Sequence, residues 1–524
     1  MSESPAEQRL NGAWLASKKG VFQLLIKASL LIGFFAITIF VGVYFRNRAS
    51  NVNDFLLGNR EVGPWLSAFS YGASYFSAVV FVGYAGQFGW RFGTAAVWIG
   101  LGNAFIGSLM AWFVLGKRTR IITNHLKSAT MPEFFGSRYD SSALKIGAAI
   151  IVFVFLIPYT ASLYNGLSRL FSMAFDIDFI YCIIAMSVIT AIYVVAGGYI
   201  ATVVNDFVQG VVMLIGIIAV IAVFLREQGG FMAAIDALAR VSDPTVSPGA
   251  YTSFFGPDPV TLLGVILLTS FGTWGLPQMV ARFYSIKSEK VITKGAIVST
   301  VFALVVAGGS YFLGTFGRLY SDVVERTETG AVVFDSIIPN IVSGFSDFIV
   351  GLVVVLVFAS SISTLSSLVM ASSSTLALDF LKGHVIKDMD DRKQLIIIRV
   401  LIVVFIVISS VIAIIQYTGS ISFIAQLMGV SWGALAGAFL APFLYGLYWK
   451  GATKASVWCS FIFSTALMTL NIFFRGSFPT LLQSPINAGA FAMMAGLVIV
   501  PVVSMFTKAP PKSVVDNCFS CYEQ

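Results

Sequence analysis

The sequence predicts an all-α integral membrane protein with about 13 spanning helices of roughly 20 residues each. Hydrophobic residues make up 57% of the 524 residues and charged residues only 11%. In a soluble domain about a quarter of the residues are charged. The mean hydropathy is +0.87. Such a chain cannot hide its apolar surface in one water-soluble core, so we expect it to lie in a lipid bilayer.

Apolar runs long enough to cross a bilayer recur along the whole chain. The expected spans are residues 22–45, 65–88, 93–116, 145–174, 178–196, 199–226, 259–284, 291–316, 344–380, 393–417, 419–447, 455–475 and 484–506. We expect residues 1–20 to form a leader, residues 21–506 to form the transmembrane domain and residues 507–524 to form a tail.

Positively charged residues divide unevenly between alternate loops. The richer set of loops lies at 46–60, 117–145, 287–294, 382–393, 450–454 and 508–512. The poorer set holds Arg9, Lys18, Lys19, Arg91, Arg240, Arg318, Arg326 and Arg475. Because cytoplasmic loops carry the excess of Lys and Arg, we expect the N-terminus outside and the C-terminus in the cytoplasm, in a cell membrane. This distribution accounts for the net charge of +8, so we expect no nucleic-acid partner. The outer loops 227–258 and 317–343 could hold short surface helices.

Two expected spans are interrupted at their centres. The span at 65–88 contains Ser-Tyr-Gly-Ala-Ser-Tyr-Phe-Ser at 70–77, and the span at 259–284 has two glycines and a proline between 272 and 277. Paired broken helices in two halves of a chain indicate an inverted repeat with a binding site near the middle of the membrane. The alternative is that these small residues only allow close helix packing.

The span at 344–380 carries an unusual density of hydroxyl groups. Ser363, Thr364, Ser366 and Ser367 fall within about one helical turn. Polar groups at this depth are costly unless they have partners. Because neutral oxygens suit a small, hard cation, this stretch predicts an ion-coupled transporter.

Asp206 is the second strong signal, because an acidic residue inside a membrane span is costly and usually functional. The structural alternative is that Asp206 caps a helix or pairs with a nearby cation.

Motifs for other functions are missing from the sequence. The only histidines, His125 and His384, fall in predicted loops, so the serines of the span at 344–380 have no base beside them. No HExxH, P-loop or dinucleotide motif occurs, so we expect no enzyme. A channel would need a repeated filter motif, and a membrane sensor would need a signalling domain. Neither feature is found in the sequence. Cys518 and Cys521 form a single CxxC, which lacks a second ligand pair for zinc, so sodium is the only metal we expect.

Four segments together resemble the sodium:solute symporter family, most nearly its bacterial sodium/proline symporters. They are residues 53–60, 197–210, 277–283 and 363–367. The resemblance implies a leucine-transporter-like fold with two inverted five-helix repeats, at about 65–226 and 259–447. One extra helix would precede the repeats and two would follow them.

The resemblance also implies sites for sodium. The first site would use the backbone carbonyls of Ala73, Phe76 and Ser360 and the hydroxyls of Ser363 and Thr364. A second site would use Asp206 with Ser363, Ser366 and Ser367. A proton could replace sodium at this acidic residue.

The solute site implied by the resemblance is formed by five residues: Ser77, Tyr159, Thr269, Thr273 and Trp274. The proline symporters have Trp and Tyr where this chain has Thr269 and Thr273, and sialic-acid members have an arginine near the position of Pro158. Trp274 could equally be a packing residue.

The function implied is a sodium-coupled symporter that imports a small organic solute by alternating access. The solute would be an amino acid such as proline, or a carboxylate such as pantothenate or another monocarboxylate. The alternatives are a proton-coupled symporter of the same fold and, less favoured, a channel or a membrane sensor. The sequence does not indicate the oligomeric state.

Overall fold

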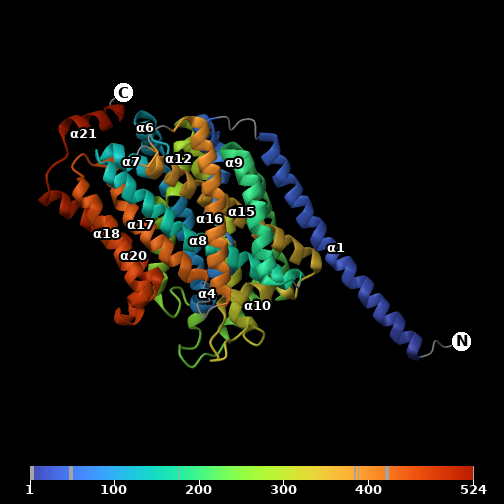
Figure 1. Ribbon diagram of the computed structural model, residues 1–524. Helices are drawn as coiled ribbons and strands as arrows, with labels where there is room; N and C mark the ends of the chain where they lie inside the picture. The colour runs from blue at the N-terminus through green and yellow to red at the C-terminus, as the bar shows by residue number, and fades with distance from the viewer. Residues whose placement is uncertain are drawn as a thin grey trace.

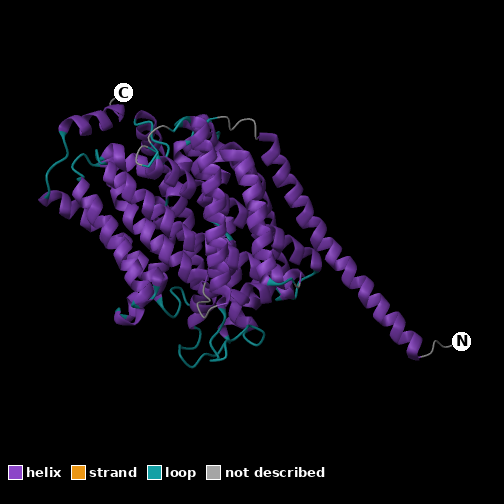
Figure 2. Ribbon diagram, viewed as in Figure 1, coloured by secondary structure: helices purple, strands orange, loops and turns teal. Residues whose placement is uncertain are grey.

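Helices make up nearly all the regular structure of the chain in the computed structural model (Figures 1 and 2). The structure describes residues 5–45, 51–175, 177–382, 385–386, 389–418 and 424–522, and within these ranges only isolated β-bridges occur. His384 and residues 419–423 of one expected span lie outside these ranges. So do Arg46, Arg48 and Lys387 of the positive loops.

The helices follow the apolar runs, because a spanning helix satisfies its backbone polar groups internally. The first half contains α1 (Pro5–Phe45), α2 (Val52–Leu57), α3 (Pro64–Tyr75), α4 (Ala85–Phe92), α5 (Val97–Gly102), α6 (Lys117–His125), α7 (Met131–Arg138), α8 (Ser142–Phe175), α9 (Phe179–Glu227) and α10 (Phe231–Ala239). The second half contains α11 (Pro259–Phe271), α12 (Pro277–Tyr284), α13 (Lys290–Thr315), α14 (Ile337–Ser343), α15 (Asp347–Thr375), α16 (Asp391–Thr418), α17 (Ile424–Tyr448), α18 (Lys454–Phe473), α19 (Thr480–Gln483), α20 (Pro485–Phe506) and α21 (Lys512–Phe519).

Ten helical segments among the described residues are long and apolar enough to cross a membrane, or eleven if the bent pair of α11 and α12 counts as one span. The predicted number of 13 is therefore not confirmed. Two of the ten segments, Val79–His125 and α9, have 47 and 49 residues. Each would extend about 70 Å as a straight helix, which is more than twice the thickness of the bilayer core.

Glycines with positive φ interrupt both long segments. Gly198 has φ 60° and ψ −164°, a conformation open only to glycine, and it divides α9 between the two expected spans 178–196 and 199–226. Gly93, with φ 59°, separates α4 from α5, and a Cβ atom there would lie 2.0 Å from the carbonyl oxygen of Tyr251.

The hydroxyl-rich helix α15 lies at the centre of the bundle. In its most apolar window 83% of the residues are buried within the protein, against 28% for α1 at the periphery. It packs against α9, α8, α1 and α3. The serine and threonine side chains of α15 therefore face other helices rather than lipid.

The two ends of the described chain lie at opposite ends of the bundle (Figure 1). The helices α6, α7, α12 and α21 lie at the end that holds the C-terminus, and α10 lies at the other end. The loops 227–258 and 317–343 hold the short helices α10 and α14, but most of α14 is buried, so it is not the surface helix that was expected.

Candidate cation and solute sites

The first expected broken span is interrupted immediately after α3. The helix ends at Tyr75, Phe76 is extended with φ −108° and ψ 113°, and a π-helix begins at Val79. A helix end leaves its last carbonyl groups without partners in the helix, and here this turn includes Ala73 and Phe76. Both residues are fully buried. The break therefore supplies backbone oxygens in the interior of the bundle.

Helix α15 presents hydroxyl groups to this break. The Thr364 hydroxyl lies 3.3 Å from the carbonyl oxygen of Ser74 and 3.1 Å from that of Ser360. Thr364 and Ser360 are both fully buried. Thr364 and Ser360 of the expected first sodium site are therefore brought to Ser74, which follows Ala73 directly and lies two residues before Phe76 in the chain.

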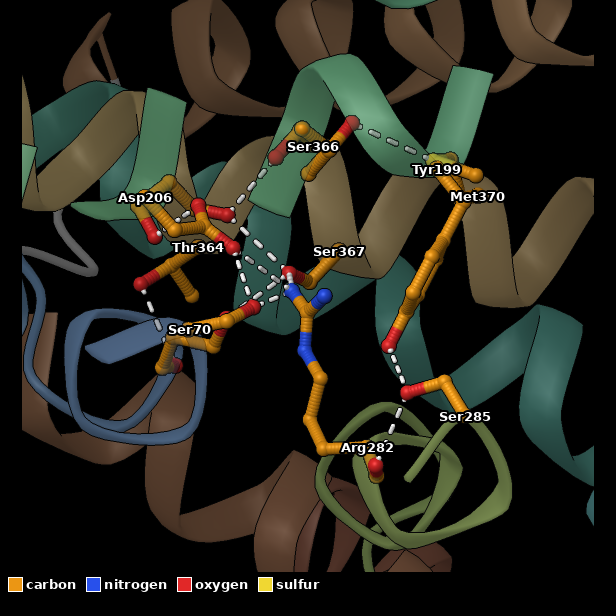
Figure 3. Close-up of polar contacts among 12 residues, drawn as sticks. Ser70, Tyr199, Asp206, Arg282, Ser285, Thr364, Ser366, Ser367 and Met370 are labelled. Atoms are coloured by element: carbon orange, nitrogen blue, oxygen red, sulfur yellow. Dashed lines mark hydrogen bonds and ion pairs between the residues drawn. The ribbon is translucent and has the colours of Figure 1, made fainter. Parts of the chain in front are cut away.

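Ser363, the fifth residue of that set, turns its hydroxyl toward Asp206 on α9. It donates to one carboxylate oxygen of Asp206 at 2.7 Å, and Ser70 on α3 donates to the other at 2.5 Å. Ser366 and Ser367 donate to the carbonyl oxygen of Ser363, at 2.8 and 3.1 Å. Of the residues expected at the second site, Ser363 thus contacts the buried Asp206 directly, and Ser366 and Ser367 lie one turn further along the same helix (Figure 3).

Arg282, on α12, reaches into this second group and was not assigned a role from the sequence. One terminal nitrogen of its guanidinium lies 3.2 Å from a carboxylate oxygen of Asp206 and 2.7 Å from the hydroxyl of Ser74. The same nitrogen contacts the Ser367 hydroxyl. Asp206 therefore pairs with a nearby cation, as the structural alternative had it.

The signal that could have identified Arg282 is present in the sequence. It lies within the segment 277–283 that carries the family resemblance, and a charged residue in a membrane span is a functional candidate by default.

A small cavity of about 50 Å³ adjoins this ionic group, and Arg282 and Ser367 form part of its wall. Ala129, from the segment before α7, lines the same cavity. The cavity therefore extends from the group toward the segment that precedes α7, and α7 lies at the end of the bundle that holds the C-terminus (Figure 1).

The residues expected at the solute site are all buried, but not all of them share one surface. The Thr273 hydroxyl lies 3.2 Å from the carbonyl oxygen of Gly107, and the Trp274 indole donates to that of Ile106 at 3.1 Å. Both side chains are thus turned toward the π-helix at Asn103–Met110. This arrangement favours packing as the role of Trp274.

Tyr159, on α8, belongs to an aromatic cluster next to the break. Its ring lies 6.0 Å from that of Trp432 on α17, which in turn lies 6.2 Å from the ring of Tyr75 at the end of α3. Trp432 was not identified from the sequence, because only the fold brings α17 to this position. The Tyr75 hydroxyl donates to the carbonyl oxygen of Thr269 at 2.5 Å.

Comparisons with known proteins agree with this architecture. The family model described as the sodium:solute symporter family matches residues 55–463. The sodium/proline symporter 2 of Staphylococcus saprophyticus subsp. saprophyticus is 29% identical over 81% of this chain and 82% of that protein. A sodium/proline symporter of Staphylococcus aureus is 30% identical over 80% of this chain and 81% of that protein.

One solved structure, a Na⁺-coupled sialic acid symporter in a substrate-bound outward-open state, aligns with a TM-score of 0.74. The alignment covers 93% of this chain and 99% of that one, at 18% sequence identity, and it confirms the expected fold class. The chain therefore belongs to the sodium:solute symporter family, and it is a multi-pass membrane transporter, not an enzyme, that couples a small solute to sodium.

Proposed function

We propose that sodium binds where α15 meets the end of α3. Its ligands would be the backbone carbonyls of Ala73, Phe76 and Ser360 and the hydroxyls of Ser363 and Thr364. The observation that carries this proposal is the contact between the Thr364 hydroxyl and the last turn of α3, at 3.3 Å. Five oxygens without formal charge would hold a monovalent ion weakly enough to release it in each cycle.

A second sodium would bind at Asp206 with Ser363, Ser366 and Ser367. The buried carboxylate and its two hydroxyl donors support this assignment. Ser363 belongs to both proposed sets of ligands, because it lies between the two sites. Its hydroxyl would bind the ion at the site that it faces. Occupation of both sites would give two sodium ions for each solute.

The transported solute would be a small amino acid such as proline, which the names of the Staphylococcus relatives favour. A carboxylate such as pantothenate or another monocarboxylate is the alternative. Tyr159 and Ser77, with Thr269 and Thr273, would line its site, and the aromatic cluster around Trp432 supports a role for Tyr159. Trp274 would act mainly by packing.

Import would follow from alternating access. Sodium at the first site would fix the break after α3 and so prepare the solute site, and each ligand would raise the affinity of the other. Each charge moved inward gains about 2.3 kcal/mol per 100 mV of membrane potential. The protein would lie in the cell membrane with the α21 end of the bundle in the cytoplasm, where the positive loops gather.

The experiment that tests this proposal is uptake of radiolabelled solutes by proteoliposomes that contain the full-length protein. We expect proline or a small carboxylate to accumulate when an inward sodium gradient is imposed, and not when choline replaces sodium. Accumulation driven by a pH gradient without sodium would favour the proton-coupled alternative. Conductance of sodium without any solute dependence would favour a channel.

A further inference from the structure

The guanidinium of Arg282 occupies the group of oxygens that would bind the second sodium ion. It contacts Asp206 on α9, Ser74 on α3 and Ser367 on α15, so one side chain joins three helices (Figure 3). Its side chain is 3% exposed and that of Asp206 is fully buried. The carboxylate of Asp206 therefore has a positive partner supplied by the protein itself.

Sodium and a guanidinium carry the same charge, and the site offers one carboxylate. Two cations beside Asp206 would repel each other strongly in an interior that screens charge poorly. An empty site would leave a carboxylate in the membrane without a partner, which is also costly. The stable states of this site are therefore those with one cation, either Arg282 or sodium.

The cavity beside Arg282 offers its side chain a second position. Gln278 lies one turn before Arg282 on α12, so the two share a face, and both line the cavity. The Gln278 side-chain oxygen is buried and has no hydrogen-bond partner among the described residues. The Arg282 guanidinium also lies 5.4 Å from the ring of Tyr199, a third lining residue. A guanidinium displaced from Asp206 would find an acceptor and an aromatic face there.

We propose that Arg282 is a tethered cation that exchanges with the second sodium ion. Sodium binding at Asp206 displaces the guanidinium toward Gln278 and Tyr199, and the return of the guanidinium expels sodium. Because the cavity extends from the site toward the segment before α7, the returning guanidinium would release sodium toward that end of the bundle. This inference rests on the proposed second sodium site and adds a mechanism that empties it.

Radioactive sodium binding to the purified full-length protein tests the exchange. Arg282→Gln removes the competing charge and keeps much of the length, so sodium affinity should rise by about fivefold or more, the usual scale of coupling between sites. Solute transport should slow, because nothing expels the ion. Unchanged or weaker sodium binding in Arg282→Gln would overturn the proposal.

A matched control is Arg318→Gln, which removes another arginine that is paired with an aspartate, Asp243, at 2.8 Å. This pair lies away from the cation sites, so its loss should leave sodium affinity unchanged. If Arg318→Gln tightened sodium binding as much as Arg282→Gln, the effect would be a general one of lost positive charge, and the exchange would be rejected.

Gln278→Leu keeps the test decisive if Arg282→Gln fails to fold. Removing an unpaired buried oxygen should not destabilise the protein. The displaced guanidinium would lose its acceptor, so sodium affinity should fall severalfold. Wild-type sodium affinity in Gln278→Leu would contradict the exchange.

Asp206→Asn separates this proposal from the one on which it rests. If Asp206→Asn binds as many sodium ions as the wild type, the second site itself is wrong. If Asp206→Asn loses one ion while Arg282→Gln and Gln278→Leu keep wild-type affinity, the site stands and only the exchange is wrong.

Discussion

The two broken spans have similar sequence causes but different surroundings. The break after α3 lies against the hydroxyl groups of α15 and near the Asp206–Arg282 pair. The break between α11 and α12, with a bend of 41°, is filled by the backbone of α17. A Cβ atom on Gly275 there would lie 2.8 Å from the backbone nitrogen of Leu440.

This comparison shows that an interruption in a span is not by itself evidence of an ion site. The first break is next to a buried ion pair, whereas at the second break Gly275 is packed tightly against α17. The two are joined directly, because the hydroxyl of Tyr75, at the end of α3, donates to the carbonyl oxygen of Thr269 on α11. This hydrogen bond ties the first break, where we propose that the ion binds, to the helix that leads into the second break.

The largest effect should follow from Asp206→Asn, which removes the charge from the first region. Breaking a buried ion pair costs roughly 3–5 kcal/mol, because the remaining charge is left without a partner. The melting temperature should fall, and fewer sodium ions should be transported with each solute, which reversal-potential measurements in proteoliposomes would detect. Asp243→Asn is the control, since its pair with Arg318 is partly exposed and its loss should cost less.

Thr364→Ala should weaken sodium binding by about tenfold, the loss expected for one hydroxyl ligand worth ~1.4 kcal/mol. Thr364→Ser retains the hydroxyl and should stay close to the wild type. Ser363→Ala should also weaken sodium dependence. The measurement is solute uptake as a function of sodium concentration, and normal sodium dependence in both alanine variants would remove α15 from the site.

Gly275→Ala should destabilise the protein by about 1–3 kcal/mol through overpacking against α17. Its sodium affinity should remain that of the wild type, because Gly275 packs against α17 and is not among the residues proposed to bind sodium. Gly308→Ala is the matched control, since among the described residues outside its own helical turn a Cβ there would meet nothing within 4 Å. Thermal unfolding with and without sodium measures both quantities. A loss of sodium affinity in a Gly275→Ala protein that stays folded would erase the distinction between the two breaks.

The smallest effect should come from Trp274→Phe. The indole loses one hydrogen bond, to the carbonyl oxygen of Ile106, which is worth about 1 kcal/mol of stability. Solute affinity should not change, because the side chain faces the helix at Asn103–Met110 rather than a ligand. A large rise in the solute concentration needed for half-maximal uptake would instead make Trp274 a solute contact.

Much of the fold could be predicted from the apolar runs. In lipid the backbone polar groups must be hydrogen-bonded within the protein, and a helix does this within a single apolar segment. The positions of both breaks followed from Gly, Pro and Ser in otherwise apolar spans. The number of spans could not be predicted as reliably. Helix α9 covers two of the expected spans and is interrupted between them only at Gly198. Hydropathy cannot decide where one crossing ends when no polar loop separates two spans.

The candidate site likewise has residues that could be predicted from the sequence and residues that could not. That Thr364 would lie beside the end of α3 could be expected from the family resemblance, and the structure brings them together. The position of Arg282 could not, because nothing in the sequence states the distance from α12 to Asp206. Trp432 was missed for a similar reason, since an aromatic residue in an apolar span usually only packs.

The most direct test of the central claim is an experimental structure determined in sodium and compared with one determined in choline. We predict an ion in the sodium structure that is bound by the carbonyls of Ala73 and Phe76 and by the hydroxyl of Thr364, and no ion there in choline. An unbroken helix from α3 through residue 84, or a sodium ion bound only elsewhere, would contradict the account.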